Sequence, residues 1–552
     1  MHIITFAFND FVFADLIFFL LGMFVLYIFN LCWLLYVKND SFIKAQNILK
    51  NFYIVILSLF TLSFIIYLFF PSFSVPFEET FIEEARNLSK NIPLYPPSNE
   101  YYPYNTMLYG PIIPLILLIF IKIPISIFIS SKIPSFIIFV SFVCLTIYNL
   151  NSQQKNIKSK LFQYFPYIYL LFLLKFNTWV YCLKAEPYFL FLVALTIFIV
   201  HKYKSTGIVF IILGFLSGFS SMIKLHGAIY IVIAFCCTSD NFKINIKKIL
   251  LYTISFFIGC ILPFTNQSIS LFSYIDLLTL VSTHGLNLML FITALATLFV
   301  FLFPLFVVFL YLFVTGSEGW NRYKFHLLII VCLELLLAIP SSKNGSFVNH
   351  LIPLIPANAF FIGKFIKFIP SSFFHDLKIK LCHSVIQSLY LVLSFICLAN
   401  VVLIFIALFY YWSDSSQSIK EVKYLNNKYL HVMMGISDTS SLYLYYNRIL
   451  LDIPQIDYLG FGDLKFAGYS DFELEDKIND CSINYFILPK SGVPFMYFDP
   501  YIGQTQTLLS VNTIKSFQKN FVLIDKTDHY NVFECQQMDS PMTPRKTTPK
   551  TP

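Results

Sequence analysis

Residues 77–118 read FEETFIEEARNLSKNIPLYPPSNEYYPYNTMLYGPIIPLILL and connect two apolar segments, at about residues 52–71 and 109–130. A helical pattern, EEARNLSK, lies within this stretch, and prolines and tyrosines follow it. A polar stretch of this length between two apolar segments predicts an extramembrane loop, which we place at residues 73–108. Four carboxylates lie within seven positions of its first part: Glu78, Glu79, Glu83 and Glu84.

The composition around this loop is that of an integral membrane protein. Of the 552 residues, 57% are hydrophobic and only 12% are charged, whereas a soluble protein carries about 25% charged residues. The mean hydropathy is +0.71. These values exclude a soluble enzyme with one hydrophobic core and a secreted disulfide scaffold. Apolar stretches of the roughly 20 residues that cross a bilayer recur along the chain. They predict 12–13 spans, at about residues 11–36, 52–71, 109–130, 133–150, 162–183, 187–203, 206–223, 225–238, 249–265, 288–314, 325–340, 351–369 and 384–411.

Basic loops predict the orientation, because Lys and Arg concentrate on the cytoplasmic side. Lys38, Lys44 and Lys50 put the first connection inside and therefore the 73–108 loop outside. Later basic loops alternate in the same way, which puts everything after Trp412 outside. The formal net charge of +8 follows from these loops and indicates no nucleic-acid partner.

One basic loop disagrees with this count. Lys155, Lys158 and Lys160 indicate a cytoplasmic loop, but two full crossings between residues 109 and 150 would put them outside. One of these two segments is therefore expected to be a broken or partly re-entrant helix rather than a simple span.

The pattern changes after the last span. Residues 412–537 predict a small extramembrane α/β domain, with β-like runs at KYLHVMMGI and INYFILPK and a helix at LEDKIND. Cys481 and Cys535 lie in this domain, where they can form a disulfide if it faces an oxidising compartment. Residues 538–552 are rich in Pro, Thr and Lys and are expected to be disordered. The predicted membrane domain is residues 1–411.

The outer loop resembles the first outer loop of the GT-C superfamily of integral membrane glycosyltransferases, particularly the branch of protein mannosyltransferases and aminoarabinose transferases. Counting back from Ala85, the resemblance favours Glu78 as the catalytic base, with Glu79 as the alternative. Asn91 replaces the usual glycine, and the acidic pair is Glu-Glu rather than Asp-Glu or Glu-Gly. The matching residues are Glu78, Glu79, Ala85, Leu88, Leu94, Tyr95, Tyr109, Gly110 and Pro111.

Three further stretches resemble motifs of the same superfamily. LKAEPYFLFLVAL is similar to its Arg-x-Asp motif and assigns Lys184 and Glu186. SSMIKLHGAIYIV is similar to a lysine-containing turn between two helices, here with Lys224 and His226. SSKNGSFVNHLIPLIPANAF is similar to a stretch that precedes a helix, with Lys343, Asn349 and His350.

The resemblance implies a GT-C-like α-helical polytopic protein that transfers a sugar from a polyprenyl-phosphate donor to a lipid, glycan or protein acceptor. Glu78, Glu79 and Glu186 would be catalytic, and Lys184, Lys224, His226, Lys343, Asn349, His350 and Tyr109 would bind the donor. The ordinary alternative for each lysine is an interfacial charge at a helix end. No metal-ligand spacing occurs, and a divalent metal is left open. His284, Lys175 and Glu334 are weaker candidates by position.

Two other functions stay open on the sequence. Many spans with a few buried charges also suit a transporter of lipid-linked glycans or small solutes, although no internal repeat is visible. A non-catalytic scaffold would leave the outer motifs without a reason to share one side. A bacterial inner membrane with a periplasmic site is favoured over the endoplasmic reticulum.

Overall fold

The computed structural model describes residues 58–59, 61–73, 78–95, 109–154, 170, 182–204, 206–240, 245–282, 285–314, 316–343, 348–366, 368, 377–437, 442–451, 455, 472–499, 504–507 and 509–536. The predicted span at 11–36, most of that at 162–183 and the 538–552 tail lie outside these residues, as do Lys175 and His284. The chain divides into two compact units: the described residues up to Asp414 belong to the first, and those from Ser415 belong to the second.

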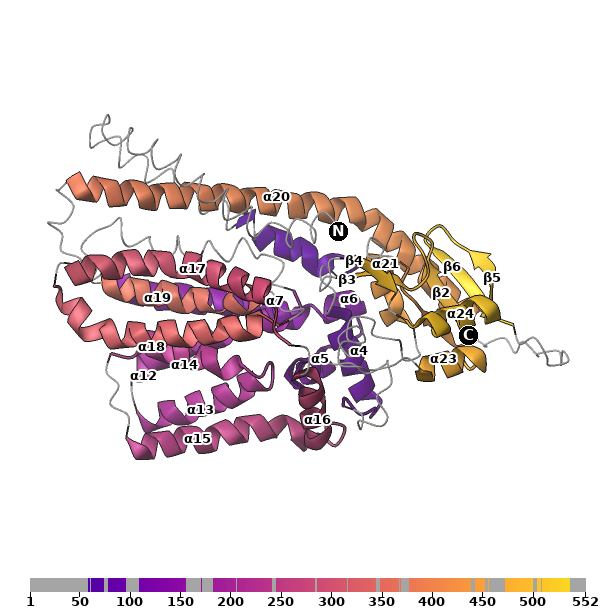
Figure 1. Cartoon of the computed structure of the whole chain (residues 1–552), viewed down its shortest axis with the longest axis horizontal. Helices are drawn as coiled ribbons and strands as arrows, with labels where there is room; N and C mark the ends of the chain where they lie inside the picture. The colour runs from indigo at the N-terminus through magenta and orange to yellow at the C-terminus, as the bar shows by residue number, and fades with distance from the viewer. Residues whose placement is uncertain are drawn as a thin grey trace. The chain divides into compact units, whose positions relative to one another are not determined.

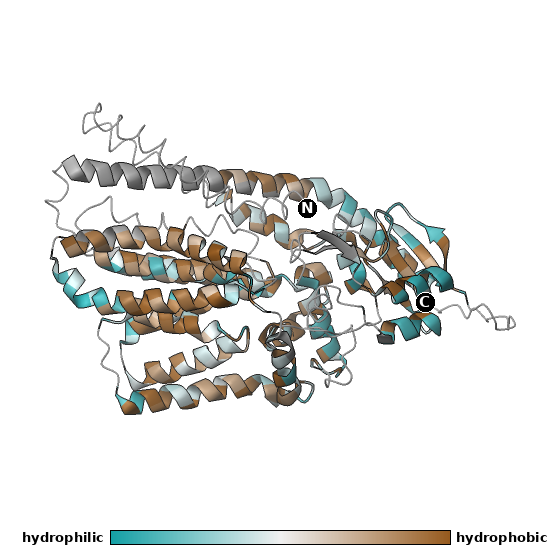
Figure 2. Ribbon diagram, in the orientation of Figure 1, coloured by the Kyte–Doolittle hydropathy of each residue, from teal (hydrophilic) through white to brown (hydrophobic). Residues whose placement is uncertain are grey.

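The first unit is a bundle of apolar helices that run side by side (Figure 1). They are mostly hydrophobic, and hydrophilic residues gather at some of their ends, such as the first turns of α15 and α18 (Figure 2). α12 packs against α14 and α19, α13 packs against α15, and α17 packs against α18 and α19. The helices are α12 (Ala185–Tyr203), α13 (Gly207–Ser221), α14 (Gly227–Thr238), α15 (Ile246–Ile261), α17 (Leu288–Val314), α18 (Glu318–Ser341) and α19 (Leu354–Ile366).

Four helical stretches of the described chain are long and apolar enough to cross a membrane: Ile127–Gln153, Ala185–Tyr203, Ile246–Thr265 and Glu318–Ser341. α13, α14 and Leu288–Phe303 are apolar but shorter. The chain is thus an integral membrane protein, while the predicted count of 12–13 spans remains a prediction. These helices differ in how much of each is buried within the protein. The Ala185–Tyr203 span is 72% buried and central, whereas Ile246–Thr265 is 17% buried and presents its apolar side chains outward.

The region between residues 109 and 150 contains the predicted break. α5 (Ile112–Phe120) has nine residues and rises about 14 Å, too little for a hydrocarbon core of about 30 Å. A turn at residues 121–126 follows, then the four-residue α6 (Ile127–Ser130) and the long α7 (Ile133–Gln154). α5 is therefore the segment that is not a simple span.

Two short helices lie beside the bundle on the side of the predicted outer loop. α4 (Glu78–Ser89) contains the acidic stretch, and α16 (Leu271–Ser282) follows the short 3-10 turn η1 (Leu262–Thr265). The backbone N–H of Leu94 donates to the Ser268 carbonyl at 2.9 Å, and the rings of Tyr95 and Tyr274 lie 5.0 Å apart. The chain after α4 is thereby fixed to the segment around α16.

The second unit is a small α/β domain. α20 (Leu377–Lys428) runs on past Trp412 into it, so its strands begin later than the change in composition suggests. The main sheet has the order β1-β2-β6-β5, with β1 parallel to β2 and the other pairs antiparallel. The other elements are β1 (Val432–Met434), α21 (Leu442–Tyr445), η5 (Tyr446–Leu450), α23 (Phe472–Asn479), β2 (Tyr485–Pro489), β3 (Met496–Asp499), β4 (Gln504–Thr507), α24 (Val511–Asn520), β5 (Phe521–Lys526) and β6 (Tyr530–Cys535).

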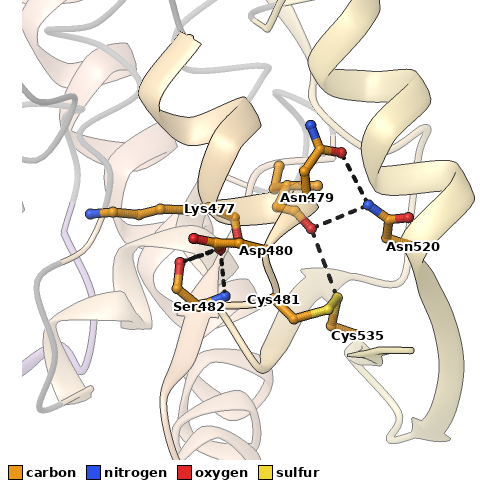
Figure 3. The surroundings of a disulfide bond; sticks show 8 residues. Lys477, Asn479, Asp480, Cys481, Ser482, Asn520 and Cys535 are labelled. Atoms are coloured by element: carbon orange, nitrogen blue, oxygen red, sulfur yellow. Dashed lines mark hydrogen bonds between the residues drawn. A yellow bond between two sulfur atoms is a disulfide. The ribbon is translucent and has the colours of Figure 1, made fainter. Parts of the chain in front are cut away.

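A disulfide closes this domain between Cys481 and Cys535, whose Cα atoms lie 5.7 Å apart (Figure 3). It ties the end of β6 to the turn after α23, and Asn520 donates to Asn479 beside it at 3.1 Å. The disulfide that the sequence allowed is therefore formed. The helix over LEDKIND and the strand over INYFILPK correspond to α23 and β2.

Candidate functional site

Glu78 begins α4 and is fully buried. Its Oε2 accepts a hydrogen bond from the Tyr67 hydroxyl at 2.5 Å, and its Oε1 accepts one from the backbone N–H of Leu183 at 2.8 Å. Two donors from different parts of the chain therefore fix the position of the Glu78 side chain. The Leu183 contact joins the outer-loop acid to the segment that carries Lys184 and Glu186.

Glu186, in the first turn of α12, is the centre of a polar cluster drawn from three separate parts of the chain. Its Oε1 accepts from Lys224 Nζ at 2.9 Å and from Asn349 Nδ2 at 2.8 Å. Its buried Oε2 has no hydrogen-bond partner among the described residues. Glu186 thus holds a lysine and an amide in place and keeps one oxygen available to a bound molecule.

Lys224 lies in the turn between α13 and α14, in an ion pair with Glu186. Its Nζ also lies 4.8 Å from the centre of the Tyr109 ring, a cation–π arrangement. Burial opposes the charge, but Glu186 and then Tyr109 outweigh it and raise the pKa of Lys224. The lysine therefore carries its charge at neutral pH.

A pair of histidines lies beside this ion pair. His226 Nε2 and His350 Nδ1 are 2.8 Å apart, and the Tyr230 hydroxyl donates to the His350 carbonyl at 2.6 Å. Burial, and then the charge of Lys224, lower the pKa of His226 to about 3. Both effects also hold the pKa of His350 well below its usual range. Both rings are thus neutral at physiological pH and share one N–H between the two facing nitrogens.

The remaining predicted cations surround His350. After burial and Lys224, its pKa is lowered by the interaction with the neighbouring His226 ring and then by the charges of Lys184 and Lys343. Burial lowers the pKa of Lys184 to about 8, against the opposing charge of Glu186. Lys343 is half-buried, and its backbone forms an isolated antiparallel β-bridge with that of Leu286. Lysines from three segments therefore produce a positive potential at one place.

The helix termini add to that potential. α12 begins at Ala185, α14 at Gly227 and α19 at Leu354, each within a few residues of the cluster, and the three helices pack against one another. Helix N-termini carry partial positive charge and unpaired N–H groups, which favour bound anions. The arrangement suits an anionic group such as a phosphate.

Tyr109 and Gly110 bring the end of the outer loop to this turn. The Tyr109 carbonyl accepts from the Tyr95 hydroxyl at 2.8 Å, and the Gly110 N–H donates to the Ile223 carbonyl at 3.1 Å. A Cβ at Gly110 would lie 1.9 Å from the Met222 carbonyl oxygen, so no other residue allows the approach. This contact is the physical reason for a glycine at position 110, between Tyr109 and Pro111.

Most of the predicted site residues therefore meet. Glu186, Lys224, Asn349 and Tyr109 are in direct contact with one another through Glu186 and Lys224, and His226 and His350 contact each other beside them. Lys184 and Lys343 act on His350 through their charge. Glu79 is fully buried next to Glu78 in the first turn of α4.

Two residues of the site were missed by sequence reasoning. Tyr67 donates to Glu78, and Lys132 donates to three backbone carbonyls close to Tyr67. The sequence could have indicated Lys132, because an ionisable residue within an apolar segment is a functional candidate by default. It could not have indicated Tyr67, since tyrosines are common throughout this chain.

Glu334 on α18 is fully buried, as is Asn358 on α19. Asn358 acts on the Glu334 carboxyl across the helix interface, yet neither side chain makes a hydrogen bond of normal geometry within the described chain. This pair is separate from the Glu186 cluster. The described residues also contain no group of three or more His, Cys, Asp or Glu side chains that could hold a metal ion.

Comparison with known proteins identifies the fold. No family model matches the chain, and no curated protein matches its sequence. Two solved structures do match: ArnT from Cupriavidus metallidurans bound to undecaprenyl phosphate, and ArnT from the same organism in the apo state. Each has a TM-score of 0.53 at 10% sequence identity. The matches cover 90% and 89% of this chain and 98% of the ArnT chain. The chain therefore has the fold of ArnT.

Proposed function

We propose that this protein is a membrane glycosyltransferase that uses a polyprenyl-phosphate-linked sugar as donor and acts on the outer side of the membrane. The observation that carries the proposal is the contact of Lys224 and Asn349 with Glu186 beside the His226–His350 pair, with Lys184 and Lys343 near enough for their charges to act on His350. This is the electrostatic environment that a phosphate leaving group requires. The fold of ArnT, one of whose structures is bound to undecaprenyl phosphate, supports the same class of donor.

In the proposed reaction, an acceptor hydroxyl attacks the anomeric carbon of the donor sugar. A new carbon–oxygen bond forms while the bond from the anomeric carbon to the phosphate oxygen breaks. The hydroxyl proton passes to Glu78, and polyprenyl phosphate leaves with the electron pair. Direct displacement of this kind inverts the anomeric configuration.

The charges of the cluster suit these steps. Lys184, Lys224 and Lys343 would stabilise the negative charge that develops on the departing phosphate. The neutral His226 and His350 can donate or accept hydrogen bonds without adding charge. Glu186 would orient Lys224 and Asn349, and its remaining oxygen would position the acceptor. Tyr109 would hold Lys224 through its ring.

The outer location is supported by two features. The basic loops alternate so that the loop with Glu78 and the domain after Trp412 lie outside. The Cys481–Cys535 disulfide in that domain is typical of proteins in oxidising compartments. A bacterial inner membrane with a periplasmic site fits both. The acceptor would be a lipid, a glycan or a protein.

The test is transfer or release of sugar from a panel of labelled polyprenyl-phosphate sugars by the purified protein in detergent. Glu78→Gln is expected to lower kcat by about 10²–10⁴-fold, the range for loss of a general base. Glu79→Gln shows whether the neighbouring carboxylate is the base instead. Glu83→Gln is the matched control, because Glu83 is buried on the same helix one turn later. A wild-type protein that consumes no donor under any acceptor condition sinks the proposal.

The same assay tests whether the reaction requires a divalent metal ion. Initial rates are compared between untreated protein, protein with a chelator, and chelated protein to which Mg²⁺ or Mn²⁺ is added back. Loss of rate on chelation with recovery on addition would assign a divalent cation to the reaction. An unchanged rate would remove it from the mechanism.

A second candidate function is transport of a lipid-linked glycan or a small solute, favoured by Glu334 and Asn358. Ionisable residues buried in membrane helices often mark substrate or ion pathways. If the protein is a transporter, the Glu334→Gln variant should no longer take up the lipid-linked glycan or solute into reconstituted vesicles. The glycosyltransferase proposal expects Glu334→Gln to leave sugar transfer unchanged.

A further inference from the structure

Lys132 is a buried cation at the junction of α6 and α7, with 1% of its surface exposed. Its Nζ donates to the backbone carbonyls of Tyr67, Phe70 and Ser72 at 3.0, 2.7 and 2.7 Å. An ammonium group has three N–H donors, so these carbonyls satisfy all of them. Its described hydrogen-bond partners are thus backbone oxygens and include no carboxylate.

The three carbonyls belong to one short piece of chain. Residues 61–69 are helical, so the Tyr67 carbonyl lies in the last turn, where it also accepts from the Phe70 N–H at 3.1 Å, and those of Phe70 and Ser72 follow the helix. A cation placed there interacts favourably with the negative end of the helix dipole. Lys132 therefore holds both the end of this helix and the residues that leave it toward Glu78.

Tyr67 connects this arrangement to the site. Lys132 Nζ lies 4.1 Å from the centre of the Tyr67 ring. The same Nζ donates a hydrogen bond to the Tyr67 carbonyl. The hydroxyl at the far end of the same ring donates to Glu78 Oε2. Lys132 thus contacts both the backbone and the ring of the residue that fixes the Glu78 carboxylate.

Aromatic packing supports the same interface independently of the charge. Phe64 packs against Phe136 and Phe139 of α7, with ring centres 5.3 and 5.0 Å apart. Phe73 packs against Phe128 of α6 at 5.2 Å. These contacts would hold the two segments together when the lysine is replaced by an apolar side chain of similar length.

We infer that Lys132 is a positioning residue for Glu78, acting through Tyr67, and this inference rests on the proposed function of Glu78 as the base. Replacing Lys132 frees the turn that carries Tyr67, so that the hydroxyl no longer holds Glu78 Oε2 in one place. Small displacements of a reacting group can lower a rate by about 10²-fold. The donor-binding lysines are left in place.

The first experiment compares Lys132→Met and Tyr67→Phe in the sugar-transfer assay. Both are expected to lower kcat by about 10–100-fold, with KM for the polyprenyl-phosphate sugar changed less than about twofold. Lys122→Met is the matched control, because Lys122 is an exposed lysine of the preceding turn. A rise in KM at unchanged kcat, or wild-type kinetics in Lys132→Met, would overturn the inference.

A double-mutant cycle separates positioning from general loosening of the fold. If Lys132 acts through Glu78, Lys132→Met in a Glu78→Gln background lowers the residual kcat by less than about twofold. A merely structural role would lower kcat by the same factor in both backgrounds. Equal factors therefore count against the inference.

A readout without activity keeps this inference distinct from the proposed function. With 3-fluorotyrosine at position 67, the ¹⁹F resonance reports the hydrogen bond between the ring hydroxyl and Glu78. The resonance is expected to shift in Glu78→Gln and to shift the same way in Lys132→Met. If the wild-type protein consumes no donor but both shifts occur, the proposed function fails and the positioning of Glu78 stands. An unmoved resonance in Lys132→Met overturns the positioning itself.

Discussion

Lys184 illustrates how burial of a single side chain sets the conditions under which the site can bind an anion. It lies at the N-terminus of α12 with 3% of its surface exposed. Burial lowers the pKa of Lys184 to about 8, although the neighbouring Glu186 raises it. Because the pKa of this base is depressed, its ammonium is charged below pH 8 and becomes neutral as the pH rises through that value.

This behaviour gives a prediction at the residue scale. If Lys184 holds the donor phosphate, KM for the polyprenyl-phosphate sugar should rise as the pH passes through about 8. Lys184→Arg should keep a low KM to higher pH, because a guanidinium remains charged throughout this range. The measurement is KM for the donor from about pH 6.5 to 9.5. Parallel curves for the two proteins would remove Lys184 from donor binding.

At the scale of elements, the contact between α13 and α15 depends on small residues. A Cβ at Gly214 would lie 2.2 Å from the Tyr252 carbonyl oxygen, and one at Gly218 would lie 2.1 Å from that of Phe256. On α15, a Cβ at Gly259 would lie 2.5 Å from the Phe215 carbonyl oxygen. Small residues at such spacing let membrane helices approach closely.

Gly218→Ala should therefore separate α15 from the bundle. We expect a loss of about 1–3 kcal/mol of stability, the usual effect of overpacking, measured as a lower Tm in detergent. Gly207→Ala is the control on the same helix, because its nearest neighbour would be Leu251 Cδ1 at an ordinary 3.6 Å. Equal Tm values for the two variants would contradict the close contact.

A second element-scale prediction concerns the end of α20 within the α/β domain. Glu421 accepts from the backbone N–H of His529 at 3.0 Å and lies 2.8 Å from its ring Nδ1. Burial alone would raise the pKa of Glu421, but hydrogen bonds from Thr527 and His529 outweigh it and lower the pKa. The stabilisation is therefore present above the usual carboxyl pKa and is lost as the pH falls through the lowered value.

The expected outcome is a Tm of the full chain that falls as the pH drops below the usual carboxyl range. Glu421→Gln should show a weaker dependence on pH in that window, since it carries no titrating group. Differential scanning calorimetry of the two proteins in a series of acidic buffers measures the Tm of each at every pH. An identical slope in both proteins would exclude Glu421 as a source of the acid sensitivity.

At the scale of the whole molecule, the Cys481–Cys535 disulfide bears on the side of the membrane occupied by the second unit. Cys481→Ser leaves Cys535 as a thiol. In intact cells this thiol should react with a membrane-impermeant maleimide if the domain faces outward. Lys247→Cys, in the first turn of α15 at an end predicted to be cytoplasmic, should react only after permeabilisation. Labelling of Lys247→Cys in intact cells, with Cys535 protected, would reverse the proposed orientation.

Several features of this protein could be predicted from the sequence because they depend on neighbouring residues. Apolar length predicts membrane helices, and the nine-residue α5 explains why the charges around it conflicted with two full crossings. The spacing of the outer-loop residues carried the resemblance to GT-C enzymes, and the ArnT fold agrees with it. The strand at INYFILPK follows from its own short apolar run between polar residues.

The site contacts depended instead on the tertiary structure, because their partners lie far apart in the chain. Asn349 reaches Glu186 across 163 positions, and Lys132 reaches Tyr67 across 65. The sequence determined which side chains are ionisable and that they lie near membrane segments. Only the packing of α12, α14 and α19 decided that Lys224 would neutralise Glu186 and that two histidines would share one hydrogen. The packing of α7 against the helix at residues 61–69 decided that a buried lysine would bind carbonyls. Charge and hydrogen-bond energies in a low-dielectric interior depend on such distances, and a sequence pattern does not contain them.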